Sequence, residues 1–151
     1  MSQAIRLDLQ HPNLSLTVTL PGYGISAVVG TSGAGKTTLL RAIAGLEAGA
    51  VGVVSINGEV WQDDAQHVHL PTYQRPVGFV FQEASLFPHL SVQANLEFGL
   101  RRTSYRLISL NQVIELLGIG TLLRRSPMTL SGGERQRVGI ARALATSPKC
   151  C

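Results

Sequence analysis

Hydrophobic and polar residues alternate with a period of two near the start of the chain. In one segment Ile5, Leu7 and Leu9 are apolar, and in the next every second residue from Leu14 to Leu20 is apolar. A period of two places the apolar side chains on one face of a strand. We therefore predict two half-buried strands, joined by a turn where His-Pro-Asn interrupts the alternation at residues 11–13.

A second hairpin is predicted around Asn57-Gly58, which lies between the apolar run 51–56 and the continuation Glu59-Val60-Trp61. Both turn residues tolerate positive φ, which a tight hairpin requires. Two further apolar runs, residues 25–29 and 77–81, show no alternation. Such runs are typical of strands buried on both faces.

Four segments combine helical spacing of apolar residues with start or stop signals. Ser109 with Gln112 and Ser131 with Glu134 have the spacing of capping boxes, and Ser91 is a third candidate N-cap. Glycines suit the ends of two of the helices. The predicted helices cover residues 38–44 (ending at Gly45), 92 to about 100, 109–117 (ending at Gly118) and 131 to about 145.

A glycine loop lies between the predicted strand 25–29 and the first predicted helix. Residues 30–37, GTSGAGKT, match the phosphate-binding pattern G-x-x-x-x-G-K-[ST] at every fixed position. The glycines let successive N–H groups face a phosphate chain, and the start of the helix adds a favourable dipole. Lys36 is expected to neutralise the outer phosphates and Thr37 to offer its hydroxyl to Mg²⁺. We infer a site for a nucleoside triphosphate.

The start of the last predicted helix has the character of a second anion site. Gly132 and Gly133 lie in its first turn, where glycine is unfavourable by about 0.8–1 kcal/mol in a helix interior. Their presence makes sense if a ligand approaches the backbone there. The bare amides and the Ser131 hydroxyl would then face a phosphate.

Two other polar features allow more than one interpretation. Gln82 follows the predicted strand 77–81, and ligands bind at the C-terminal edge of parallel sheets, although a glutamine that merely caps the strand is the alternative. Residues 62–70 contain two aspartates and two histidines. We interpret them as a polar loop rather than a metal site, because no second well-spaced ligand pair accompanies the histidines.

Composition narrows the class of protein. With 44% hydrophobic and 15% charged residues, the chain of 151 residues is globular rather than disordered. It has no apolar run long enough to cross a membrane and no visible signal peptide, and its two adjacent cysteines cannot form a disulfide framework. These features favour a cytosolic protein. The basic residues behind the net charge of +4 are spread along the sequence, so no nucleic-acid partner is expected.

The motifs together resemble the nucleotide-binding subunits of ATP-binding cassette (ABC) transporters. The resemblance rests on GTSGAGKTT at 30–38, VFQ at 80–82 and LSGGERQR at 130–137, and it extends over essentially the whole chain. The finer pattern at 86–100 and 116–127 looks like the ATPase of molybdate importers, and related importers for other solutes share much of it. The implied fold is α/β, a RecA-like P-loop NTPase core with an antiparallel β patch and a small helical subdomain.

The resemblance implies a role for each motif residue. Gln82 would sense Mg²⁺ and the attacking water, so Lys36 and Gln82 are the catalytic candidates and Thr37 and Gln82 the metal candidates. Ser131, Gly132 and Gly133 would contact ATP bound to the opposite subunit of a head-to-tail homodimer. An aromatic residue stacked on adenine is usual upstream of the glycine loop; here Tyr23 is too near the loop, and His11 is the one candidate. The expected ATP-binding residues are Gly30, Thr31, Ser32, Gly33, Ala34, Gly35, Lys36, Thr37 and Thr38.

The resemblance also implies residues that this sequence does not contain. The family continues into an apolar strand ending in Asp-Glu and then a histidine, which hold Mg²⁺, activate water and contact the γ-phosphate, whereas this chain ends at Cys151. The C-terminal part of the core is therefore expected to be missing. We predict that the 151-residue chain alone hydrolyses ATP very poorly.

The resulting expectation is an energy-coupling ATPase subunit of an importer for molybdate or a similar oxyanion. It would bind permease subunits, without inserting into the membrane, on the cytoplasmic face. Residues 1–85 would form the core with its β subdomain, 86–129 the helical subdomain and 130–151 the signature segment. Two alternatives remain: a nucleotide-binding module without turnover, and a soluble ABC ATPase acting on nucleic acid.

Overall fold

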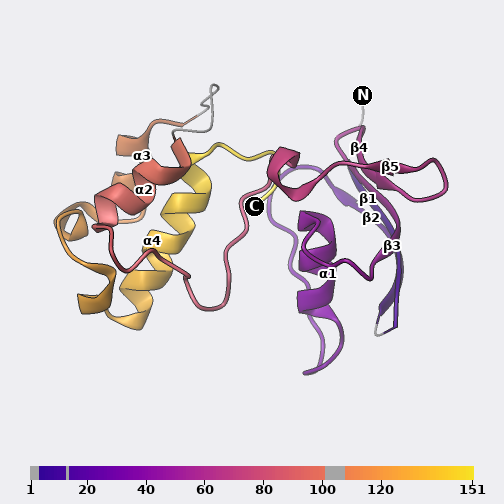
Figure 1. The fold of residues 1–151 in the computed structure, drawn as a ribbon, viewed down its shortest axis with the longest axis horizontal. Coiled ribbons are helices and arrows are strands. Elements are labelled where there is room, and N and C mark those ends of the chain that lie inside the picture. The colour runs from indigo at the N-terminus through magenta and orange to yellow at the C-terminus, as the bar shows by residue number, and fades with distance from the viewer. Residues whose placement is uncertain (1–3, 13, 101–107) are drawn as a thin grey trace. The chain divides into compact units, whose positions relative to one another are not determined.

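The computed structural model describes residues 4–12, 14–100 and 108–151, and its elements are shown in Figure 1. These residues form two compact units, 1–76 and 77–151, which are described separately below. The boundaries predicted at residues 86 and 130 remain a proposal. Within the second unit the helices on either side of residue 130 share one core.

The first unit is built on an antiparallel sheet with strand order β2-β1-β3-β4-β5. Leu7 and Leu9 are buried while their neighbours Arg6 and Asp8 are exposed, as the alternation predicts. Trp61 is also fully buried in the core of the sheet. The strands are β1 (Ala4–His11), β2 (Leu14–Pro21), β3 (Val51–Ile56), β4 (Glu59–Asp63) and β5 (Val68–His69).

Both predicted hairpins are confirmed. β1 pairs with β2 from Ala4 opposite Pro21 to His11 opposite Leu14, although Asn13 of the turn lies outside the described residues. β3 pairs with β4 across Asn57 and Gly58, whose φ angles are 52° and 85°. Positive φ at both positions is what a two-residue hairpin turn with the correct twist needs.

Helix α1 (Lys36–Ala44) begins in the glycine loop and ends, as predicted, at Gly45. Gly45 has a φ of 74°, and a Cβ added there would lie 2.8 Å from the guanidinium carbon of Arg75. Glycine is therefore required for two reasons: the left-handed backbone of the cap and the close approach of a side chain.

Arg75 ties the end of α1 to the sheet and is only 4% exposed. Its guanidinium donates to the carbonyl oxygens of Ala42 (3.1 Å) and Ile43 (2.8 Å) in the last turn of α1. It also donates to the carbonyl of Leu70 at 2.8 Å and to Oε1 of Gln62 in β4 at 3.4 Å. Burial lowers the pKa of Arg75. The cation is stabilised by carbonyl dipoles at the negative end of a helix.

The second unit is helical. α2 (Val92–Leu100), α3 (Leu110–Leu116) and α4 (Gly132–Ala145) lie where the sequence predicts helices, and short 3₁₀ turns cover Thr72–Gln74 in the first unit and Gly120–Leu122 and Pro127–Thr129 in the second. Residues 101–107 of the predicted helical subdomain lie outside the described residues. The core contains Val92, Leu96, Val113, Ile119, Leu122, Leu130, Val138 and Ala141.

The prediction of strands at 25–29 and 77–81 is wrong for this structure. Residues 25–30 form no strand, and Ile25 and Val29 are 100% and 92% exposed. Of the second run only Val77 pairs, through an isolated parallel bridge to Cys150. A strand exists only with a hydrogen-bonded neighbour, and no neighbouring strand for either run is found among the described residues.

Replacing Arg75 by methionine is expected to lower the free energy of unfolding of the first unit by about 2–4 kcal/mol, because buried carbonyl groups lose a charged donor. Urea titration followed by the fluorescence of Trp61, the single tryptophan, measures the change. Arg6→Met, on the exposed side of β1, is the control and should change the free energy of unfolding by less than about 0.5 kcal/mol. Equal midpoints for both variants would contradict the role given to Arg75.

Candidate functional site

The glycine loop leaves the start of α1 open to a ligand. Gly33 and Gly35 have φ angles of 83° and 81°, a left-handed conformation that curls the loop around its own amides. Gly35 is the N-cap of α1, and no side chain accepts a hydrogen bond from the first N–H groups. These donors belong to an exposed loop, so an anion can satisfy them.

Lys36 folds back over the same loop. Its Nζ donates to the carbonyl oxygens of Gly30 (2.8 Å) and Thr31 (2.7 Å). Among the described residues no carboxylate forms an ion pair with it. The cation is therefore held beside the open amides with its charge uncompensated, which is the donor set that a phosphate chain requires.

The other residues that the sequence predicts to bind ATP lie on the same loop and at the start of α1. Thr31, Ser32, Ala34 and Thr37 are exposed or half-buried on the loop and the first turn of α1, and Thr38 follows one residue further on. Thr37 carries a hydroxyl, an oxygen ligand of the kind that Mg²⁺ accepts. Residues 30–38 thus form the loop and the first three residues of α1, and no Asp or Glu lies among them.

His11, the candidate for the adenine contact, lies beside residues that follow the C-terminal end of α1. Nε2 of His11 lies 3.7 Å from Oε1 of Glu47, and the imidazole contacts the position where Gly49 would carry a Cβ. Both neighbours follow the C-terminal end of α1, whereas the glycine loop precedes its N-terminal end. Tyr23 is 74% exposed.

The start of α4 differs from the start of α1 because it caps itself. The Ser131 hydroxyl accepts from the N–H of Glu134 at 3.3 Å, and a Glu134 carboxylate oxygen accepts from the N–H of Ser131 at 2.7 Å. This is the capping box that the sequence predicts. Gly132 and Gly133 are exposed beside it, and a Cβ on either would meet no atom within 4 Å. Space for a ligand is present there.

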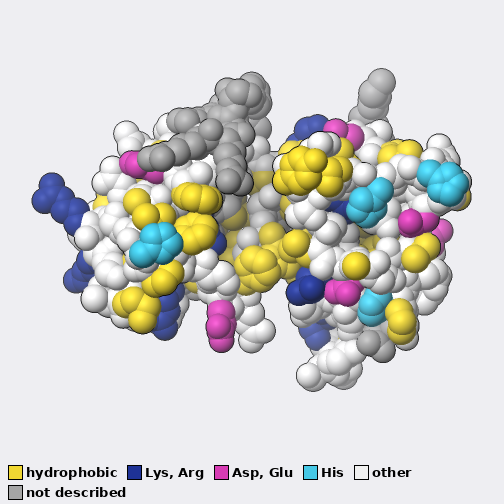
Figure 2. Space-filling model, in the orientation of Figure 1, with side chains coloured by type: hydrophobic (Ala, Val, Ile, Leu, Met, Phe, Trp, Pro, Cys, Tyr) yellow, Lys and Arg dark blue, Asp and Glu magenta, His cyan; other side chains and the backbone are white. Residues whose placement is uncertain are grey.

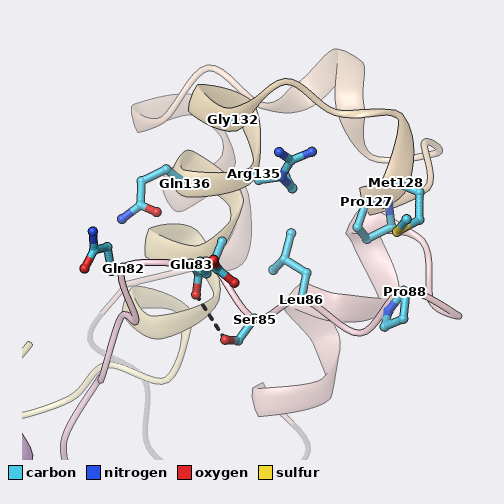
Figure 3. A pocket seen from close by; sticks show the side chains of 11 residues that line it. Gln82, Glu83, Ser85, Leu86, Pro88, Pro127, Met128, Gly132, Arg135 and Gln136 are labelled. Atoms are coloured by element: carbon cyan, nitrogen blue, oxygen red, sulfur yellow. Dashed lines mark hydrogen bonds between the residues drawn. The ribbon is translucent and has the colours of Figure 1, made fainter.

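Gln82 shares a cavity with the start of α4, an arrangement that the sequence did not predict. The cavity measures about 590 Å³. In Figure 3, Gln82 and Gln136 lie on one side of it and Pro88, Pro127 and Met128 on the other, with Arg135 and Leu86 between them. Only the fold joins the two regions, since Gln82 and Gly132 are fifty positions apart (132 − 82).

Asn95 supports the segment beside this cavity, and the sequence motifs did not indicate it. It is fully buried in α2 and holds the segment that lines this cavity: its Oδ1 accepts from the N–H of Phe87 at 2.8 Å, and its Nδ2 donates to the carbonyls of Phe87 and Leu90. A polar residue beside Leu96, on the buried face of the helix, is the sequence signal that indicates it.

The two aspartates of the polar segment at the end of β4 form hydrogen bonds within the fold. Oδ2 of Asp64 accepts from the side chain of Gln62 and from the N–H of Gly52, and these bonds lower the pKa of Asp64. Asp63 accepts from the N–H and side chain of Gln66. Asp63 thus binds the turn, whereas Asp64 joins the start of β3 to β4. No group of three or more metal-ligating side chains is found in the part of the chain that the structure describes.

A family model described as ABC transporter matches residues 14–151. The chain belongs to the ABC transporter family. A solved dimer of MJ0796, a bacterial ABC transporter cassette, is similar over 78% of this chain and 54% of that one, with a TM-score of 0.59 and 33% identity. The ATP-binding subunit of another ABC transporter, 23% identical, covers 98% of this chain and 63% of its own with a TM-score of 0.73. These cassettes show the P-loop NTPase fold.

The "Molybdenum import ATP-binding protein ModC 1" of Azotobacter vinelandii is 60% identical to this ABC-family chain over 146 residues, which is 95% of the chain and 40% of the relative. A ModC protein of Pseudomonas fluorescens is 57% identical over 153 residues, which is 99% of the chain and 42% of that relative. The chain spans about 40% of the length of the curated relatives it matches.

The capping box of α4 predicts a pH dependence. The hydrogen bonds from Ser131 lower the pKa of Glu134 relative to the unfolded chain. The box therefore adds stability that is complete at neutral pH and is lost as the pH falls through the folded pKa of Glu134. Glu134→Gln does not titrate at this position, so its loss of stability between neutral pH and about pH 3 should be smaller than that of the parent chain.

Urea titration followed by helix circular dichroism at both pH values checks this expectation. Glu115→Gln, at an exposed position in α3, is the matched control for the loss of a carboxylate that belongs to no capping box. If Glu134→Gln loses as much stability in acid as the parent chain, protonation of Glu134 does not weaken the capping box.

Proposed function

We propose that this chain is an ATP-binding, energy-coupling subunit of an ABC importer. The observation that carries the proposal is the uncapped start of α1, where left-handed glycines, free amides and the uncompensated Lys36 converge. A triphosphate chain satisfies each of these groups. When bound with ATP, Mg²⁺ supplies charge neutralisation at the phosphates, and Thr37 and Gln82 are the residues proposed to hold it.

The signature segment, residues 130–137, is proposed to complete the site of a second copy. Its exposed Gly132 and Gly133 amides and the Ser131 hydroxyl suit the γ-phosphate of ATP bound by the partner in a head-to-tail homodimer. The solved MJ0796 cassette is a dimer, which supports this arrangement. Hydrolysis by the complete assembly is part of the proposal. Slow turnover by the 151-residue chain alone stays a prediction.

The transported solute is proposed from the relatives. Proteins named as molybdenum import ATP-binding proteins share 54–60% identity with this chain, which supports molybdate or a similar oxyanion. The role requires permease partners and a location on the cytoplasmic face of the membrane. None of the described helices has the length and apolarity needed to cross a bilayer.

The alternative of an ABC ATPase that acts on nucleic acid has less support. On the face shown in Figure 2, the Lys and Arg side chains of each unit are scattered among polar and hydrophobic ones rather than gathered in a stripe. Duplex binding depends on a contiguous basic surface and shows a steep dependence on salt.

Lys36→Ala is expected to weaken ATP binding at least about tenfold, because the phosphates lose a charge-assisted hydrogen bond. Equilibrium dialysis with ATP and Mg²⁺ measures the dissociation constant. Arg6→Ala removes the same charge from the exposed side of β1 and should leave it unchanged. If the parent chain binds no ATP, or both variants bind as the parent does, the proposed function fails.

We propose that the cavity that contains Gln82 forms part of the interface with a permease subunit, and Met128→Glu tests this interface. Met128 is 75% exposed at the cavity that contains Gln82, and a charge there should reduce co-purification with the permease subunits of a molybdate importer about tenfold or more. Leu116→Glu places the same charge on α3 at a position that is 68% exposed, and should have no effect. Equal recovery of both variants would remove this cavity from the interface.

A further inference from the structure

The segment that follows Gln82 is fastened to α4 near the C-terminal end of that helix. Nη2 of Arg142 donates to the carbonyl oxygens of Ser85 at 3.1 Å and Ala84 at 3.4 Å. The guanidinium carbon also lies 5.4 Å from the centre of the Phe87 ring, within range of a cation–π interaction. One side chain of α4 thus contacts three of the five residues after Gln82.

A second contact lies one turn earlier on α4. Gly139 is buried, and a Cβ added there would come within 3.2 Å of the Cβ of Ala84 and 3.6 Å of its Cα. Any larger residue would push the segment away from the helix. Glycine in a helix interior is unfavourable by itself. The close approach of Ala84 is therefore a physical reason for a glycine at this position.

The segment itself has an irregular backbone that needs external support. Ser85 has a φ of 43°, which is uncommon for a residue with a side chain, and its hydroxyl donates to the carbonyl of Glu83 at 3.0 Å (Figure 3). Its carbonyl groups belong to no helix or sheet, so Arg142 supplies the donors that regular structure would otherwise provide. Within the described residues Arg142 forms no ion pair with a carboxylate, which leaves its donors to these carbonyls.

We propose that Arg142 is a positioning residue that holds residues 83–87 against α4 and thereby fixes Gln82 relative to the signature segment. α4 is a continuous helix from Gly132 to Ala145, so its start and Arg142 are joined by a rigid rod of about 15 Å. A displacement of the start of α4 would therefore move the segment after Gln82, and a displacement of that segment would move the start of α4. The role of Gln82 toward nucleotide rests on the proposed function, whereas the attachment of the segment to α4 does not.

Native-state cleavage by a glutamate-specific protease tests the attachment, because Glu83 is exposed within the held segment. Cleavage of a folded chain reports local opening. Arg142→Ala is expected to raise the rate after Glu83 about tenfold or more, with no change after Glu115 or Glu134. Arg142→Lys, which keeps a donor, should restore most of the protection. Arg124→Ala removes an exposed charge from the same unit and should cleave like the parent chain.

Gly139→Ala separates positioning from general stability. Alanine favours a helix over glycine, so α4 should become more stable, while the new Cβ pushes Ala84 away. We expect faster cleavage after Glu83 together with unchanged or slower cleavage after Glu134. An unchanged rate after Glu83 in Arg142→Ala, or an equal rise after every glutamate, would overturn the proposal.

The dissociation constant for ATP, measured with and without Mg²⁺, tests the consequence for Gln82. Mg²⁺ is expected to increase the affinity of the parent chain for ATP. In Arg142→Ala and in Gln82→Ala this increase should be smaller severalfold, and by a similar factor in both variants. Without Mg²⁺, both variants should bind ATP with the dissociation constant of the parent. A loss in Gln82→Ala that is absent in Arg142→Ala would overturn the link to Gln82. If the parent chain binds no ATP, or Gln82→Ala has no effect, the proposed function or its role for Gln82 fails, and the proteolysis decides the positioning role alone.

Discussion

Backbone hydrogen bonding decides which segments of this chain acquire regular structure and which stay open to a ligand. Every strand needs a neighbouring strand, and every helix start has N–H groups that need acceptors. The antiparallel sheet satisfies the first requirement within residues 4–69, because hairpins bring each strand its own partner. The run 25–29 has no partner among the described residues and forms no strand, in spite of its apolar sequence.

The same requirement distinguishes the two helix starts that contain glycine. At α4 the side chains of Ser131 and Glu134 occupy the cap, so the helix is complete by itself, and the neighbouring glycines remain exposed. At α1 no side chain takes that position, and Lys36 is folded over loop carbonyls beside the open amides. An unsatisfied helix start in an exposed loop is an arrangement that binding of an anion stabilises. The difference explains why the first site is proposed to hold the nucleotide of its own chain.

In each unit, a buried or half-buried arginine joins a helix to another segment of the same unit. Arg75 binds carbonyls at the end of α1, and Arg142 binds carbonyls of the irregular segment after Gln82. For each, burial lowers the pKa, and the planar guanidinium distributes its donors over several oxygens. The sequence predicted no function for either arginine. Each of them nevertheless contacts an element for which the sequence predicted a role in nucleotide binding. A single side chain with several donors can join an element to a loop that no sheet or helix would otherwise hold.

Local features follow from residue type and spacing, because they depend on residues close along the chain. The hairpin at Asn57-Gly58, the end of α1 at Gly45 and the capping boxes of α3 and α4 were all predicted from spacing and residue type. So was the glycine loop with Lys36 beside it. The other features depend on how the chain folds in three dimensions. The tertiary structure left the apolar runs 25–29 and 77–81 without paired neighbouring strands among the described residues and brought Gln82 into one cavity with Gly132. It also buried Asn95 and Arg75 against backbone carbonyls of other segments. Those outcomes depend on which segments meet in space, and a periodic pattern does not contain that information.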